Sequence, residues 1–319
     1  MNTSTTARPA LNDVRTEVAK AVVGQDHAVT SLLIGLLAEG HVLLEGVPGV
    51  AKTLLVRSLS EAMELDNTRV QFTPDLMPGD VTGSLIYDAS TSQFRFREGP
   101  VFTNLMLADE INRTPPKTQA ALLEAMEEHQ VSVDGTTYPL PEPFMVIATQ
   151  NPIEYEGTYP LPEAQLDRFM LKVKLDLPSR DEEMKILNRH ATGFRPNDLI
   201  QAGLKAVASQ HTITTARTEI AEVKTSQEVL AYIVELVQAT RSSPSLQAGV
   251  SPRGSTALMK CAKAWAWLVG RDFITPDDVQ ALLLPCLRHR VSLRPEAEMD
   301  GVSVDQVLSG LISTISVPR

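Results

Sequence analysis

The chain has 319 residues, of which 43% are hydrophobic, 21% charged and 5% aromatic. This ordinary globular composition excludes a disulfide-stapled miniprotein, a collagen-like chain and a disordered polyelectrolyte, and the length predicts two domains. The formal net charge of −10 argues against a general binder of DNA or of anionic membranes, because such binders need clustered cations.

Short apolar segments alternate with helical patterns in the first half of the chain. Strands are predicted at residues 41–45, 69–72, 104–108, 144–149 and 170–175, and helices at residues 51–64 and 115–128. Nearly continuous apolar strands that are separated by helices indicate a parallel sheet covered on both faces. We therefore predict an α/β domain over residues 1–178.

Two β-hairpins are predicted inside this domain. One joins residues 84–87 to 94–97, and the other joins 130–133 to 136–138 through Asp134-Gly135, a strong hairpin dipeptide. Each is either an ordinary extension of the sheet or additional surface. Residues 127–143 contain four carboxylates and no lysine or arginine, which argues against contact with a nucleic-acid backbone.

Only helix signals follow residue 178. Helix starts are predicted from capping boxes at 179–182 and 225–228 and from cap-proline pairs at 251–252 and 275–276. Gly270 and Pro285 are predicted helix ends. The sequence therefore predicts a second, all-α domain over residues 179–319.

The sequence also predicts a cytoplasmic protein with no direct membrane insertion. Its two cysteines, Cys261 and Cys286, lie in apolar surroundings without metal-ligand spacing, so we expect buried free thiols in a reducing compartment. The first ten residues are polar and predict no signal peptide. The apolar run at residues 28–38 is far shorter than the roughly 20 residues that span a bilayer.

A glycine-rich segment joins the first predicted strand to the next helix. Its small residues let backbone N–H groups converge on phosphate oxygens, and the helix N-terminus adds a favourable dipole. Lys52 can reach the β- and γ-phosphates, and the Thr53 hydroxyl can bind Mg²⁺. Ala51 replaces a usual glycine, which is tolerable if Ala51 is already helical. The predicted phosphate loop is Gly46, Val47, Pro48, Gly49, Val50, Ala51, Lys52 and Thr53.

Polar side chains follow two predicted strands at the edge where parallel strands end. Asp109 and Glu110 follow the strand at 104–108, and Asn151 follows the strand at 144–149. Because ligands bind at this edge, we expect Asp109 to face Mg²⁺ through water and Glu110 to polarise an attacking water. Asn151 either holds that water, senses the γ-phosphate or only caps a turn before proline.

Two arginines are further candidates. Arg253 lies in the first turn of a predicted helix, where a cation opposes the helix dipole unless an anion approaches. It is therefore a candidate phosphate ligand from the second domain. Arg168 follows Asp167 just before the last predicted strand, and such a neighbouring pair is usually a surface ion pair.

Five segments resemble those of the AAA+ ATPases, and specifically of the MoxR family, in their amino-acid sequence and in their order along the chain. They are GVPGVAKT, LADEINR, ATQNP, LPEAQLDRF and SPRG. The resemblance covers residues 15–319. The alanine at position 51 is also part of that family's version of the phosphate-loop motif. It implies an α/β AAA+ P-loop NTPase core, with a parallel sheet sandwiched by helices, followed by a helical lid domain.

The resemblance also implies a role for each matching residue. Lys52 and Thr53 correspond to Walker A, with Thr53 on the metal. Asp109, a metal ligand through water, and Glu110, the catalytic carboxylate, correspond to Walker B. Asn151 corresponds to sensor 1.

Further matches concern the adenine base, the lid, the subunit boundary and the hairpins. Val23-Gly24-Gln25 resembles the segment whose backbone contacts adenine, and Arg253 corresponds to sensor 2. Arg168 corresponds to the arginine finger, which acts on ATP held by the neighbouring subunit, and Arg113 is a second candidate for such a contact. The hairpins are similar to insertions of the helix-2-insert branch, which face the ring's pore or rim.

In function, the resemblance implies a Mg²⁺-dependent ATP hydrolase that forms a ring of six copies. Such a motor remodels or matures protein complexes, in some cases for metal insertion, together with a von Willebrand A-domain protein. Alternatives are a nucleic-acid motor, a metal-chelatase motor subunit and a small-molecule P-loop kinase. No guanine-reading Asn-Lys-x-Asp motif occurs, so ATP is preferred over GTP.

Overall fold

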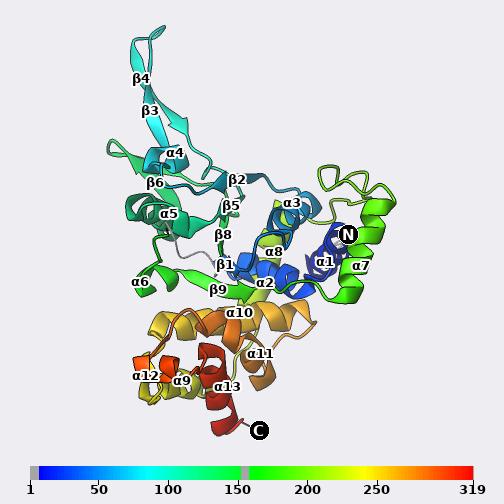
Figure 1. Ribbon diagram of the computed structural model, residues 1–319, viewed down its shortest axis with the longest axis vertical. Coiled ribbons are helices and arrows are strands. Elements are labelled where there is room, and N and C mark those ends of the chain that lie inside the picture. Colours follow the sequence, from blue (N-terminus) through cyan, green and yellow to red (C-terminus); the bar gives the residue numbers. More distant parts are fainter. Residues whose placement is uncertain (1–6, 152–157, 319) are drawn as a thin grey trace.

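The computed structural model describes residues 7–151 and 158–318. Its central strands are β1 (His41–Glu45), β2 (Asn67–Gln71), β5 (Leu105–Asp109), β8 (Met145–Gln150) and β9 (Phe169–Lys174). They form one sheet in the order β2–β5–β8–β1–β9 (Figure 1), and all neighbouring pairs are parallel. The prediction of an α/β domain with a parallel sheet is confirmed, with strand ends displaced by at most two residues.

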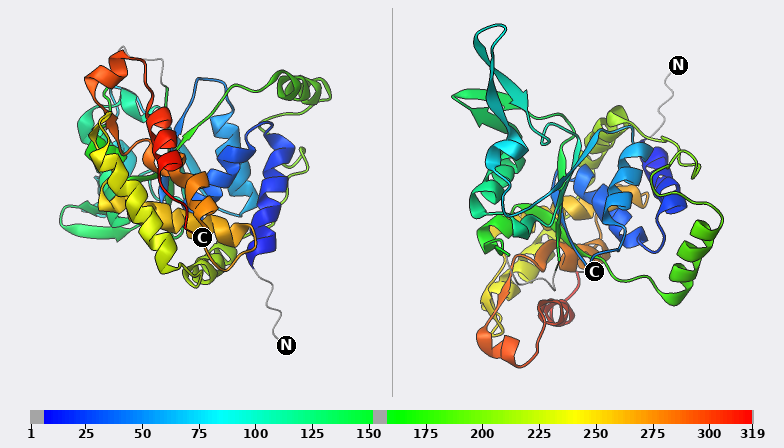
Figure 2. Two further views of the ribbon diagram at one scale, coloured as in Figure 1. Left: turned by 90° about the horizontal axis from the view of Figure 1, so that it is seen from below. Right: turned by 45° about the horizontal axis from the view of Figure 1, so that its top comes forward.

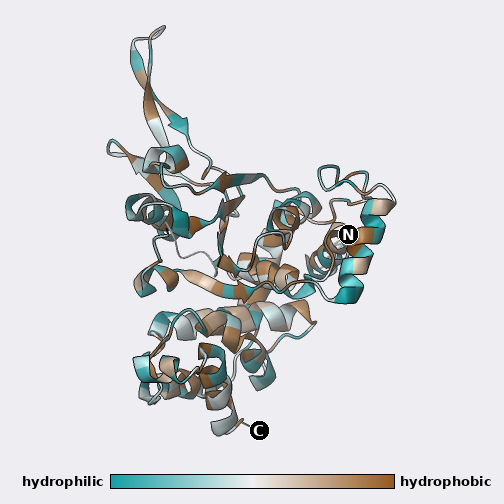
Figure 3. Ribbon diagram, in the orientation of Figure 1, coloured by the Kyte–Doolittle hydropathy of each residue, from teal (hydrophilic) through white to brown (hydrophobic). Residues whose placement is uncertain are grey.

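Two hydrophobic cores lie on the two faces of this sheet, because successive residues of a strand point to opposite sides. Along β1, Val42 and Leu44 belong to one core and Leu43 belongs to the other. The first core includes residues of α1 (Ala7–Ala21), α2 (Asp26–Leu37) and α3 (Lys52–Ala62). The second includes residues of α4 (Pro78–Thr82) and α5 (Pro116–Glu128). Figure 2 shows the sheet between these helices, and Figure 3 shows its strands as mostly hydrophobic.

A buried histidine joins three elements of the α/β part. His41 is 5% exposed at the start of β1. Its Nδ1 accepts a hydrogen bond of 2.9 Å from the backbone N–H of Val146, so its Nε2 carries the proton and donates to the carbonyl of Met126 at 2.9 Å. Burial lowers the pKa of His41 from 6.5 to about 4, which keeps the imidazole neutral at physiological pH.

We expect this histidine to make the fold sensitive to mild acid. The unfolded chain takes up a proton near pH 6.5, whereas folded His41 does so only near pH 4. The free energy of unfolding should therefore fall as the pH decreases between these values, by up to the order of 3 kcal/mol from this residue. Urea unfolding at several pH values measures the slope. A His41→Asn variant should show a shallower slope, and an unchanged slope would contradict the assignment.

Helices dominate the chain after β9. They are α7 (Arg180–Ala191), α8 (Gln210–Ala221), α9 (Gln227–Ser242), α10 (Pro252–Leu268), α11 (Pro276–Leu287), α12 (Pro295–Met299) and α13 (Val304–Thr314). α10 packs against α9, α11 and α2, and α11 packs against β9. α8 contacts α1, α2 and α10. The lid helices α9 to α13 therefore lie along the β9 side of the sheet, whereas α7 lies beside α1 (Figure 1).

Three expectations for this region are corrected. Residues 179–319 are not entirely helical, because the loops beside α10 and α11 pair as strands β10 (Leu246–Ala248) and β11 (Ser292–Leu293). These strands are too short to show an alternating pattern, yet their pairing satisfies backbone groups. Pro285 does not end α11, since burial of the following Cys286 and Leu287 outweighs the loss of one helical hydrogen bond. Ser226, not Thr225, caps α9 by accepting from the N–H of Val229.

Both predicted hairpins are present, as two antiparallel pairs separate from the central sheet. They are β3 (Gly83–Asp88) with β4 (Gln93–Glu98), and β6 (Gln130–Val133) with β7 (Thr136–Pro139). Phe96 stacks on Tyr138 at 4.0 Å between ring centroids and so connects them. The β3–β4 hairpin projects far from the sheet (Figures 1 and 2), and near its tip Tyr87 and Phe94 are 57% and 68% exposed.

Two further expectations concern burial and membranes. Cys261 and Cys286 are buried and free, as predicted. Within the described ranges, no helix has both the length and the apolar character needed to cross a membrane. The prediction of no signal peptide rests on the first ten residues, and the first six of these lie outside the described residues.

Candidate functional site

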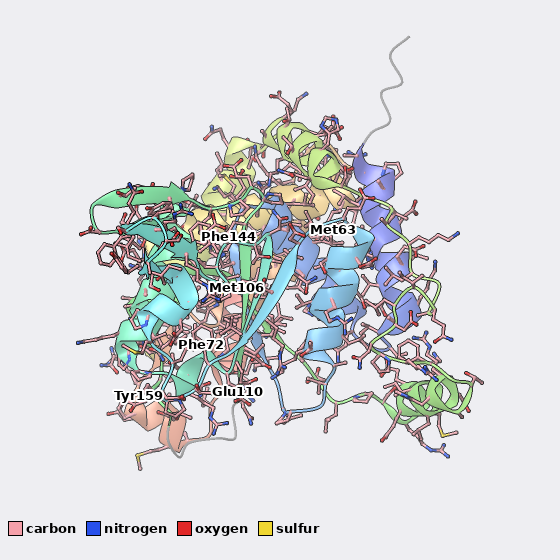
Figure 4. The ribbon with its side chains drawn as sticks, turned by 90° about the horizontal axis from the view of Figure 1, so that it is seen from above. Met63, Phe72, Met106, Glu110, Phe144 and Tyr159 are labelled. Atoms are coloured by element: carbon pink, nitrogen blue, oxygen red, sulfur yellow. The ribbon has the colours of Figure 1, made fainter. Side chains whose placement is uncertain are left out.

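A cavity of about 570 Å³ lies at the carboxyl ends of the central strands. The sequence-predicted residues that line it are Val23, Pro48, Gly49, Ala51, Lys52, Thr53, Asp109, Glu110 and Asn151. The predicted residues Gly24, Gln25, Gly46, Val47 and Val50 belong to the same two loops but are not among the described lining residues. In Figure 4, Glu110 lies just beyond the end of the strands, opposite the end at which Phe144 precedes β8. The fold thus brings the predicted loop, carboxylates and amide together.

The glycine-rich loop forms an open cradle before α3. Gly49 has φ +90°, and a Cβ added there would meet no atom within 4 Å. The loop is therefore open on the side of Gly49. The Lys52 ammonium donates to the carbonyl oxygen of Gly46 at 2.5 Å, across the loop. Lys52 is the first residue of α3, so the helix N-terminus points into the cradle.

Ala51 differs from the sequence-based expectation. It is not helical but has the left-handed conformation, with φ +60° and ψ +26°, immediately before α3. This conformation costs an L-residue about 1–2 kcal/mol. Strain of this kind is typical of functional loops that the surrounding structure holds in place.

We therefore expect Ala51→Gly to stabilise the folded protein by about 0.5–1 kcal/mol, because the relief of strain outweighs the greater freedom of glycine in the unfolded chain. Ala51→Val should have the opposite sign, since a branched Cβ fits this conformation poorly. Denaturant unfolding of both variants measures the two shifts. Equal stability of the three proteins would show that the strain is absent.

Asp109 is held by partners from two other strands. Its Oδ2 accepts from Arg69 on β2 at 2.7 Å, and its Oδ1 accepts from the Thr149 hydroxyl on β8 at 2.6 Å. Thr149 is fully buried and also accepts from the backbone N–H of Glu110 at 2.9 Å. Hydrogen bonds from both sides fix the direction of the Asp109 carboxylate.

Glu110 is the first residue after β5 and has a strained left-handed backbone with φ +57°. Its Oε2 accepts from Gln71 at 2.6 Å and from Arg113 at 3.1 Å. Gln71 comes from the end of β2, which is paired with β5. Two donors therefore hold the same oxygen, and they fix the direction in which the Glu110 carboxylate points.

Sequence reasoning did not identify Arg69, Gln71 and Thr149. The alternation along β2 places Arg69 and Gln71 on one face, but only the pairing of β2 with β5 puts that face beside the two carboxylates. Thr149 lies inside a predicted strand, where a threonine is usually only a residue of the core. The chain carries no local signal for these contacts.

Five of eight further lining residues are apolar, and these eight come from the end of α1, from α7 and from the segment after α7. They are Ala21, Val22, Ile186, Arg189, His190, Phe194, Pro196 and Asn197. Arg189 of α7 donates to the carbonyls of Ala19 and Lys20 at 3.0 and 2.8 Å, which fastens α7 to the end of α1. A cavity with both a glycine-rich loop and apolar side chains suits a nucleotide, whose phosphates are charged and whose base is largely apolar.

Arg168 and Arg253 lie elsewhere. Both line a second cavity of about 200 Å³, which Glu127, His41 and Lys260 also line. Arg168 follows α6 (Glu163–Leu166), and Arg253 lies in the first turn of α10. The structure therefore does not place Arg253 beside the phosphate loop of its own chain. It places Arg253 in the same cavity as Arg168.

Comparison with known proteins identifies the family of the chain. Residues 41–171 match the ATPase family associated with various cellular activities (AAA), and residues 238–311 match the AAA lid domain. The chain is 48% identical to protein YeaC of Bacillus subtilis (strain 168) over 310 residues, which are 97% of this chain and 95% of that protein. It is 42% identical to Chaperone MoxR1 of Mycobacterium tuberculosis over 312 residues, which are 95% and 81% of the two chains.

A crystal structure of a protein from Cytophaga hutchinsonii is also similar, with a TM-score of 0.90 and 42% identity, and the match covers 98% of this chain and 96% of that one. The similarity to these proteins extends over both the α/β part and the lid. The chain belongs to the MoxR family of AAA+ ATPases.

Proposed function

We propose that this protein is a Mg²⁺-dependent ATP hydrolase that works as a ring, of six copies, and remodels protein partners in the cytoplasm. One observation carries the proposal. Lys52, Thr53, Asp109, Glu110 and Asn151 come from three separate segments and line one cavity. Bound ATP would span it, with adenine beside Val23 and the apolar side chains and with the phosphates over Gly49.

The residues present fit a nucleotide with its metal ion. The Thr53 hydroxyl and the Asp109 carboxylate are hard oxygen donors, which Mg²⁺ prefers alongside water and phosphate oxygens. A Mg²⁺ ion held there would neutralise negative charge on the phosphates. Lys52 pairs with the β- and γ-phosphates, and the N–H groups at Gly49 and the start of α3 bind their oxygens.

Glu110 accepts the proton of the attacking water, and its bonds to Gln71 and Arg113 keep the carboxylate in one orientation. Asn151 is 7% exposed at the end of β8, where its amide can hold that water against the γ-phosphate. The Thr149 hydroxyl donates to the Asp109 carboxylate and accepts from the backbone N–H of Glu110, so it ties the direction of the Asp109 carboxylate to the backbone of Glu110.

We further propose that each site is completed by a neighbouring copy. Arg168 and Arg253 lie together, away from their own phosphate loop, at side-chain exposures of 31% and 48%. Two partly exposed guanidinium groups on one surface suit the phosphates of an adjacent subunit. This replaces the expectation that Arg253 binds the phosphates within its own chain.

The partner is proposed to be a protein with a von Willebrand A domain, or a complex that such a protein helps to mature, for example by metal insertion. Exposed Tyr87 and Phe94 form an edge-to-face pair near the tip of a projecting hairpin, which suits contact with a protein surface. The second hairpin has acidic surroundings that disfavour a nucleic-acid motor.

Capture of a von Willebrand A-domain protein in ATP, in ADP and without nucleotide tests the remodelling proposal. Binding should depend on the nucleotide and should fall when residues 84–97 are replaced by a short turn, because affinity that differs between states is what permits work on a partner. Deletion of residues 131–138, most of the second hairpin, is the comparison variant. Nucleotide-independent capture, or salt-sensitive binding of DNA instead, would contradict protein remodelling and leave the ATPase proposal standing.

A further inference from the structure

A single carboxylate bridges Arg168 and Arg253. Glu127 lies in the last turn of α5, and its Oε2 is 3.0 Å from Nη2 of Arg168. Its Oε1 is 3.1 Å from Nη1 of Arg253. The two arginines come from different parts of the fold, one from the segment before β9 and one from the lid. Glu127 therefore joins the α/β part and the lid through two charged side chains.

The backbones beneath these arginines are already fastened by other residues. The carboxylate of Asp167, next to Arg168, accepts from Ser251 at 3.1 Å and pairs with Arg290. Arg290 has a side chain only 2% exposed and also donates to the carbonyls of Asp167 and Phe169 at 3.0 and 2.7 Å. Ser251 directly precedes the helix in which Arg253 lies. These contacts around the buried Arg290 keep the two backbones in place without Glu127.

Glu127 acts instead on the exposed ends of the side chains. Its own side chain is 38% exposed, and exposed ion pairs add little to folding stability. The two guanidinium groups would otherwise repel one another and the Lys260 ammonium, which lines the same cavity. A carboxylate between the arginines offsets that repulsion. Each guanidinium has five N–H donors, so one contact to Glu127 leaves each able to donate to phosphate as well.

We propose that Glu127 is a positioning residue that presents Arg168 and Arg253 as one unit to the nucleotide of the adjacent subunit. The inference rests on the proposed ATPase with shared sites. Without Glu127 the two side chains adopt many rotamers, and the phosphates of the neighbour must order them at an entropic cost. Loss of such ordering lowers turnover while nucleotide binding in the subunit's own cavity is unaffected.

The test compares Glu127→Ala and Glu127→Gln with Glu128→Ala. Glu128 is exposed on the same turn of α5, and among the described lining residues of the second cavity α5 contributes Met126 and Glu127 but not Glu128. We expect Glu127→Ala to lower kcat about tenfold to a hundredfold, the range of a misplaced contact, with the KM for ATP, the assembled size and the melting temperature unchanged. Glu127→Gln should retain part of the turnover, since its amide oxygen still accepts one hydrogen bond. Glu128→Ala should match the wild type.

Mixed assemblies separate this role from a structural one. A Glu127→Ala subunit keeps Glu110, and a Glu110→Gln subunit keeps ordered arginines. Mixing the two should give more activity than the sum of the separate proteins. A Glu127→Ala subunit, which keeps its catalytic Glu110, then receives ordered arginines wherever its neighbour is a Glu110→Gln subunit. Wild-type turnover of Glu127→Ala, or no gain on mixing, would overturn the inference alone. Wild-type turnover of Arg168→Ala would overturn the shared site and this inference with it.

Discussion

Replacement of Glu110 by glutamine is expected to leave ATP binding intact and to slow hydrolysis by at least ~10²-fold, the scale of a lost general base. Glutamine has the shape of glutamate and can still face Gln71 and Arg113, so the cavity keeps its form. It cannot accept a proton from water at physiological pH. The chemical step therefore slows while the phosphate contacts of Lys52 and the loop persist.

Phosphate release and binding of a fluorescent ATP analogue measure the two effects separately. Lys52→Ala is the contrasting variant, because it should lose nucleotide affinity through the lost charge pairing with the phosphates. Gln71→Ala should fall between the wild type and Glu110→Gln, since Gln71 only orients the carboxylate. Equal hydrolysis by the wild type and Glu110→Gln would remove Glu110 from the mechanism.

Arg168→Ala is expected to keep ATP binding and to lose most turnover, since arginines supplied in trans contribute on the order of 10³-fold or more in P-loop enzymes. Arg168 does not line the cavity that holds Lys52 and Glu110, so its removal should leave the subunit's own nucleotide contacts in place. The specific activity of the wild type should rise with protein concentration as subunits assemble.

Turnover and light scattering over a dilution series measure this dependence. Arg180→Ala, which removes an exposed arginine in the first turn of α7, is the matched control and should behave as the wild type. A stable monomer with full activity would show that each chain holds a complete site.

Local segments of the sequence determined much of this protein. The strands, the phosphate loop and both hairpins are each set by short runs of residues, whose apolar runs, glycines and turn dipeptides constrain the backbone without distant contacts. The collection of Lys52, Asp109 and Asn151 at one edge was also predictable, because parallel strands end at a common edge.

The tertiary structure alone decided three features of the site. The pairing of β2 with β5 places Arg69 and Gln71 on the two carboxylates, and the conformation of Ala51 is imposed by the loop around it. The position of the lid directs Arg253 to Glu127 instead of to its own phosphate loop. Strand order, strained backbone and domain packing all depend on contacts between residues far apart in the chain, and the free energies of such contacts have no signature in any local run of residues.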